Sequence, residues 1–155
     1  MTLLSVRDLH VGFGRDPKAN EVVKGVSFDL AAGETLAIVG ESGSGKSVTT
    51  LSINRLVDFG GGHITRGTIE LQRTDGSVLD VSMADEATLR GIRGRDVGMI
   101  FQEPMTSLNP VHTVGSQIEE AFRLNRGLRG AEARQAALEV LERVRIPEAK
   151  SRLGY

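Results

Sequence analysis

The chain has 155 residues, a length that predicts a single domain, and hydrophobic residues make up 39% of it, as in a soluble protein. Its 19 basic and 20 acidic side chains give a formal charge of -1, so no overall positive field favours binding of nucleic acid. Cysteine is absent, which excludes disulfides and cysteine-ligated metals and agrees with a reducing compartment. Glycine is enriched, at 19 residues, so the positions of the glycines are the first question.

The first third of the chain is predicted to be mostly β-structure. Residues 3–13 and 22–30 are rich in Val, Leu and Phe and predict two strands joined by a run of turn-forming residues. The short apolar run 35–39 then predicts a strand that is buried on both faces. Residues 46–57 carry apolar side chains at roughly helical spacing, so a strand, a glycine-rich loop and a helix are expected to follow one another.

The rest of the chain is predicted to mix α and β elements. The alternation of apolar side chains predicts a β-hairpin over 68–81 and an apolar strand at 97–101. Helical spacing predicts helices at 84–93, 114–126 and 131–145. Ser82, with Asp85 three residues later, indicates the start of the first of these helices, and Pro147 ends the last.

The most informative glycines of the chain lie in one loop. Residues 40–47 read Gly-Glu-Ser-Gly-Ser-Gly-Lys-Ser, a complete match to the phosphate-loop pattern G-x-x-x-x-G-K-[ST]. A chain of this composition is expected to contain about 0.01 such matches by chance. A glycine-rich turn that binds nothing would not need the adjacent Lys46–Ser47 pair, so the sequence predicts a site for a nucleotide phosphate.

Each residue type in this loop has a chemical reason. Gly40, Gly43 and Gly45 permit positive φ angles and remove side chains that would keep backbone N–H groups from converging on phosphate oxygens. The helix that follows adds its unpaired N–H groups and the positive end of its dipole. Lys46 is expected to reach the β- and γ-phosphates, and the Ser47 hydroxyl to ligate Mg²⁺.

A second run of residues, 101–110, makes the chain resemble the ATP-binding subunits of ABC transporters. It reads Phe-Gln-Glu-Pro-Met-Thr-Ser-Leu-Asn-Pro and, with the loop version at 40–48, is typical of importers for oligopeptides, dipeptides, nickel and glutathione. Residues 144–149 are most similar to the ATPases of glutathione importers and of their close peptide-importing relatives. The resemblance covers essentially the whole chain. It implies an α/β P-loop NTPase fold, with a partial ABC ATPase core and N-terminal antiparallel β part at 1–102 and the start of a helical subdomain at 103–155.

The resemblance also implies roles for individual residues. Phe13 matches an aromatic residue that stacks on adenine, although a strand residue of the core would look the same. Gln102 matches a glutamine that contacts Mg²⁺ or the attacking water. The implied ATP-binding positions are Phe13, Gly40, Glu41, Ser42, Gly43, Ser44, Gly45, Lys46, Ser47 and Val48, and the implied magnesium ligands are Ser47 and Gln102.

Partners and location follow from the same resemblance. The loop 103–114 is expected to receive the transmembrane permease subunits. In the full-length protein, a second ATP-binding domain is expected to complete a dimer. An external substrate-binding protein is expected to be an indirect partner. Nucleic acid is not an expected partner. Such a subunit lies peripherally on the cytoplasmic face of the inner membrane.

Three motifs that ATP hydrolysis needs in this family are not found in the sequence. There is no run of four apolar residues followed by Asp-Glu, no Leu-Ser-Gly-Gly-Gln signature and no switch histidine. In the family these follow the position that corresponds to Tyr155, so we expect an incomplete domain that is marginally stable by itself. The strands that end at Gly40 and Gln102 would also lack the strands that lie between them. ATPase activity is expected of the full-length protein and not of this chain.

Two other functions stay open at this point. The chain could be a non-enzymatic module that binds nucleotide without turnover, or a soluble phosphate-loop kinase, which would need a lid with arginines and an acid near the acceptor. A metal site is not predicted from the histidines, because His10, His63 and His112 are isolated from one another in the sequence.

Overall fold

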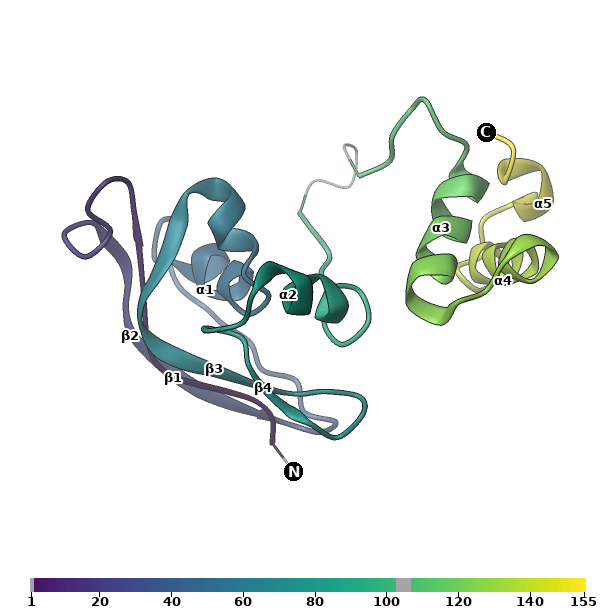
Figure 1. Cartoon of the computed structure of the whole chain (residues 1–155). Coiled ribbons are helices and arrows are strands. Elements are labelled where there is room, and N and C mark those ends of the chain that lie inside the picture. The colour runs from purple at the N-terminus through teal and green to yellow at the C-terminus, as the bar shows by residue number, and fades with distance from the viewer. Residues whose placement is uncertain (1, 103–106) are drawn as a thin grey trace. The chain divides into compact units, whose positions relative to one another are not determined.

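The computed structural model describes residues 2–102 and 107–155 (Figure 1). The chain divides into two compact units, with the boundary between Val97 and Gly98. Each unit contains its own cluster of buried apolar side chains, so each is described by itself.

The first unit is built on a four-stranded antiparallel sheet with the strand order β2-β1-β3-β4. The strands are β1 (Thr2–Phe13), β2 (Glu21–Ala31), β3 (Gly62–Gln72) and β4 (Val78–Asp80). β1 is paired on both sides, so that Val11 lies opposite Val23 on β2 and Ile64 on β3. The two predicted N-terminal strands and the predicted hairpin are confirmed, although β3 begins earlier than expected.

A bulge in β1 aligns its apolar side chains with the core. The register of β1 shifts near Asp8, which has a φ of +47°. Because of this shift, Val6 and Leu9 are both fully buried although they are three residues apart. Gly67 on β3 lies so close to the backbone of Asp8 that a Cβ atom would clash there, and its φ of +96° is one that glycine adopts readily.

The helices of the first unit are shorter than the sequence predicts. The helix expected over 46–57 is α1 (Lys46–Ser52), and a separate 3₁₀ helix, η1 (Leu56–Gly60), follows it. Arg55 lies between them in the left-handed region, with a φ of +57°, so a continuous helix is interrupted there.

The third helix of this unit, α2 (Glu86–Ile92), begins two residues later than the predicted range 84–93. Its N-cap is Asp85, whose carboxylate accepts a hydrogen bond from the backbone N–H of Thr88 at 2.8 Å. Ser82 does not cap the helix, because its hydroxyl donates to Asp80 instead.

The two apolar runs predicted to be buried strands are not strands in the structure. Residues 35–39 pair with no other segment among the described residues, and the side chain of Val39 is 89% exposed. Residues 98–101 are also unpaired within the described chain, and Ile100 is 98% exposed. A strand buried in a sheet needs neighbours that satisfy its backbone N–H and C=O groups. The prediction was wrong because apolar composition alone does not supply those neighbours.

The second unit is a small helical bundle of α3 (Val114–Arg126), α4 (Gly130–Arg143) and α5 (Ala149–Arg152). The two predicted helices are confirmed, but α5, which follows Pro147, was missed because it has only four residues. Ala137, Leu141, Ala149 and Leu153 form the core of the unit. No helix within the described ranges is both long and apolar enough to span a bilayer.

A polar cluster joins the three long strands of the first unit around His10. Its Nδ1 lies 2.8 Å from the carboxylate of Glu21, and its Nε2 lies 3.2 Å from the carboxylate of Asp8. The hydroxyl of Thr65 on β3 donates to Glu21 at 2.6 Å. The pKa of His10 is raised, chiefly by the hydrogen bond with Glu21; desolvation opposes this rise, and the hydrogen bond with Asp8 adds to it. The pKa of Glu21 is lowered by the hydrogen bonds from Thr65 and His10.

We predict that this cluster makes the stability of the first unit depend on pH. Because folding raises the pKa of His10, the stabilisation is complete below the unfolded pKa of about 6.5 and is lost as the pH rises through the folded value. The difference in melting temperature between wild type and His10→Gln should therefore be larger at about pH 5.5 than at about pH 8.5.

Thermal unfolding followed by circular dichroism at the two pH values measures this difference. His63→Gln is the matched control, because His63 is exposed. A His10→Gln difference that is the same at both pH values would contradict the prediction.

Candidate functional site

The glycine-rich loop is the site that the sequence singles out, and its backbone conformation depends on glycine. Gly43 and Gly45 have φ angles of +82° and +89°, which side-chain-bearing residues rarely adopt. The backbone N–H of Ser44 donates to the carbonyl of Glu41 at 3.2 Å and closes a tight turn at the tip. The loop therefore turns back sharply just before α1 begins at Lys46.

The glycines at both ends of the loop are closely packed. A Cβ atom on Gly45 would lie 3.3 Å from the carbonyl oxygen of Val22 and 3.3 Å from a methyl group of Val23, both on β2. A Cβ on Gly40 would approach the Ser44 hydroxyl oxygen to 2.7 Å. The loop is thus seated on β2 at one end and folded onto itself at the other.

The backbone of the loop leaves a set of hydrogen-bond donors free. The N–H groups of Gly43, Gly45, Lys46 and Ser47 have no acceptor within the described part of the chain. The first closed bond of α1 runs from the N–H of Thr49 to the carbonyl of Gly45 at 2.8 Å. Successive free N–H groups in a turn ahead of a helix form a concave donor surface that suits an anion.

The side chain of Lys46 lies across the loop. Its Nζ donates to the carbonyls of Gly40 at 2.7 Å and Glu41 at 2.6 Å, and it lies 3.3 Å from the Ser44 hydroxyl. The ammonium group is therefore held beside the free N–H groups by neutral acceptors. The Ser47 side chain is exposed, and its hydroxyl has no partner among the described residues.

The other predicted site residues lie in different parts of the structure. Phe13 ends β1, half-buried, with its ring against Gly62. The strand β1 pairs with β2, and Gly45 of the loop packs against β2. The sheet therefore connects Phe13 to the loop. Val48 packs on the core of the unit, while Glu41 and Ser42 are exposed. Gln102 is exposed and lies in the second unit, so its role stays a prediction.

Comparison with known proteins decides the family. The family model described as "ABC transporter" matches residues 23–155. This chain belongs to the ABC transporter family. Membership agrees with the phosphate-loop geometry, because this family is a class of P-loop NTPases and its domain implies binding of a nucleotide.

Three relatives illustrate the range of similar proteins. The glutathione import ATP-binding protein of Pectobacterium atrosepticum is 49% identical over 149 residues, which cover 96% of this chain and 24% of that protein. The corresponding protein of Escherichia coli is 48% identical over 152 residues, which cover 98% of this chain and 24% of that protein. A putative peptide import ATP-binding protein of Brucella melitensis is 48% identical and covers 98% and 45%. The chain therefore spans less than half the length of these relatives.

The residues of this ABC family member fit a bound nucleotide phosphate. The free N–H groups supply donors, Lys46 supplies a positive charge, and the cradle between Gly40 and Ser44 is one that a Cβ atom would fill. The exposed Ser47 hydroxyl is an oxygen donor of the kind that Mg²⁺ prefers.

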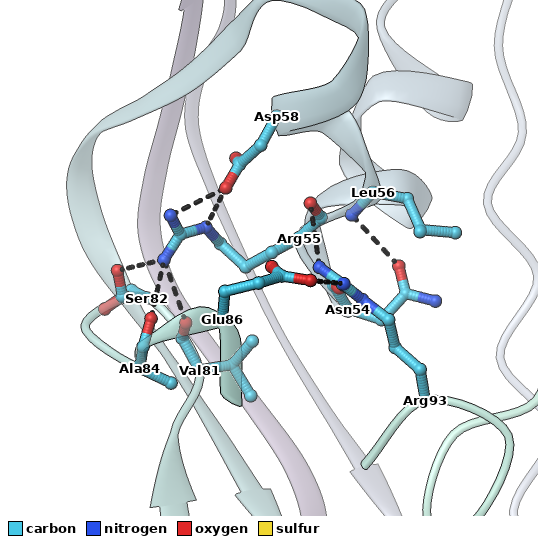
Figure 2. A network of polar contacts seen from close by, with 9 residues as sticks. All are labelled: Asn54, Arg55, Leu56, Asp58, Val81, Ser82, Ala84, Glu86 and Arg93. Atoms are coloured by element: carbon cyan, nitrogen blue, oxygen red, sulfur yellow. Dashed lines mark hydrogen bonds and ion pairs between the residues drawn. The ribbon is translucent and has the colours of Figure 1, made fainter. Parts of the chain in front are cut away.

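Sequence reasoning missed a polar network around the turn that follows α1, at the opposite end of this helix from the loop (Figure 2). Arg55 donates to the carboxylate of Asp58 at 2.8 Å and, through Nη1, to the carbonyl of Ser82 at 3.0 Å. Arg93 donates to the carbonyl of Asn54 at 2.9 Å and to the carboxylate of Glu86 at 2.7 Å. No local pattern indicates these contacts, because the partners lie up to 39 residues apart in the sequence.

We predict that Gly45→Ala destabilises the first unit by about 1–2 kcal/mol, because alanine at a positive φ is strained and its Cβ would press on Val22. Gly91→Ala is the matched control. Gly91 lies within α2 with open space around its Cα, so alanine should be neutral or stabilising by up to about 1 kcal/mol. Urea unfolding of both variants measures the two free energies, and equal values would contradict the assignment.

Proposed function

We propose that this chain binds ATP with Mg²⁺ through the loop at 40–47, as the ATP-binding portion of an ABC-type importer. The observation that carries the proposal is the convergence of free backbone N–H groups and the Lys46 ammonium at one loop of a member of this family. These groups are the donors and the charge that a triphosphate requires.

Each residue has a stated part in this proposal. Lys46 would exchange its bonds to the Gly40 and Glu41 carbonyls for bonds to the β- and γ-phosphate oxygens. The Ser47 hydroxyl would hold Mg²⁺, which when bound neutralises charge on the phosphates. Phe13 would stack on adenine, and Gln102 would contact Mg²⁺ or the attacking water.

The class of transported substrate is proposed from the relatives. Two of the relatives above are named as glutathione importers and one as a putative peptide importer, so we propose uptake of peptides or glutathione for the whole protein. In the whole protein, a second ATP-binding domain would complete a dimer and an external substrate-binding protein would deliver the substrate. The chain would then lie peripherally on the cytoplasmic face of the membrane.

The surface for the permease is proposed at the loop 103–114, of which residues 103–106 lie outside the described residues. In the described part, Leu108 and Val111 are 50% and 84% exposed. Gln117 on α3 braces this part by donating to the carbonyls of Asn109 and His112, each at 3.0 Å. In the full-length complex, crosslinks from Val111→Cys should reach a permease subunit, and crosslinks confined to other subunits would refute this surface.

A second candidate function is nucleotide binding without turnover by the 155-residue chain. The exposure of the apolar runs at 35–39 and 98–101 favours it, because hydrolysis in P-loop enzymes needs residues held at the ends of assembled strands. We expect the chain to release no phosphate from ATP above background while a full-length relative does so in the same assay. Measurable turnover that Lys46→Ala abolishes would refute this candidate.

We predict that Lys46→Ala abolishes binding of a fluorescent ATP analogue, because the variant lacks the only side-chain cation that lies within the described loop. Fluorescence anisotropy of the 155-residue chain with the analogue and Mg²⁺ measures the affinity. Lys150→Ala, which removes an exposed lysine of α5, is the control and should bind as wild type does. Wild-type affinity in Lys46→Ala would refute the role of the loop.

A further inference from the structure

Helix α1, which carries Lys46 and Ser47, is weak by itself. It has only seven residues, and its N-cap, Gly45, makes no side-chain cap bond. The hydroxyls of Thr50 and Ser52 bond back to carbonyls of the preceding turn, a pattern that tends to bend helices. Val48 and Leu51 pack this helix on the core, and contacts at its ends therefore add to what fixes the position of its first turn.

Arg93 makes such contacts just beyond the C-terminal end of α1. Its Nε donates to the carbonyl of Asn54 at 2.9 Å, and Nη2 lies 3.4 Å from the carbonyl of Arg55. Nη1 donates to Glu86 at 2.7 Å, and the guanidinium lies 5.1 Å from the centre of the Phe59 ring. The Arg93 side chain is only 17% exposed, so these contacts are made largely out of water.

Arg55, a residue of the same turn, makes a second set of contacts through its side chain. As Figure 2 shows, its guanidinium contacts Asp58 and the carbonyls of Val81, Ser82 and Ala84. The turn after α1 is thus tied by one arginine to the segment after β4 and by the other to α2.

We propose that Arg93 is a positioning residue for the nucleotide loop, which it orients by holding the end of α1. This inference rests on the proposed binding of ATP at that loop. With a rise of about 1.5 Å per residue, α1 is about 10 Å long, so a shift at its end moves Lys46 and the free N–H groups at its start. Among the described residues no hydrogen bond or ion pair joins Arg93 to the loop at 40–47, so Arg93 would act on the loop through the turn that follows α1.

The test compares three variants of the 155-residue chain. Arg93→Ala removes both carbonyl contacts and should weaken binding of the fluorescent ATP analogue roughly fivefold or more. Glu86→Gln removes the ion pair but leaves the carbonyl contacts, and should change the affinity by less than about twofold. Arg90→Ala removes an exposed arginine of the same helix that makes no ion pair within the described chain, and should also bind within about twofold of wild type.

Hydrogen exchange without nucleotide separates positioning from general loss of structure. In Arg93→Ala, the amides of Thr49 to Ile53 should exchange faster, while the amides of β1 and β3 keep their wild-type protection. Unchanged exchange in α1, an equal loss of protection in the sheet, or wild-type affinity in Arg93→Ala would each overturn the inference. If wild type itself does not bind the analogue, the proposed function fails, and faster exchange of α1 alone would still show that Arg93 holds this helix.

Discussion

The pairing of β1 with strands on both of its sides is the interaction on which the first unit depends. β2 and β3 satisfy its backbone hydrogen bonds, and the side chains that the sheet buries, such as Leu9 and Ile69, form the surface on which the helices pack. The nucleotide loop is fixed to this sheet because Gly45 lies against Val22 and Val23 of β2. Residues 35–39 pair with no strand among the described residues, and they lie exposed.

In the nucleotide loop, unlike in the sheet, several backbone N–H groups are left without an acceptor in the described part of the molecule. In the sheet the N–H groups between paired strands find acceptors, whereas the N–H groups of Gly43 and Gly45 have none within the described chain. Such an arrangement costs free energy in a buried site but little in an exposed one, where water can bond to the free donors. The neutral carbonyls that hold Lys46 are weak competitors for its charge, so an anion that meets the free donors can also attract the ammonium.

How much could be predicted from the sequence depends on how local each interaction is. The alternation in β1 and β2 and the glycine spacing at 40–47 are local signals, and the elements they predict are present. The predicted strands at 35–39 and 97–101 require partners from elsewhere in a sheet, and their composition does not reveal whether those partners are present. The contact of His10 with Glu21 could not be predicted because it forms through strand pairing, and Arg93 contacts a turn 39 residues earlier in the chain.

The loop is anchored unequally on its two sides, and this bears on the strength of binding. On its C-terminal side it continues into α1, which the arginines hold, but on its N-terminal side it joins the exposed residues 35–39. When only a fraction of molecules has the loop in its binding conformation, the apparent affinity falls by that fraction. A ligand must then supply the ordering that a paired strand would otherwise provide. The contacts at the end of α1 therefore contribute more to the orientation of the loop than they would if residues 35–39 were paired on both sides.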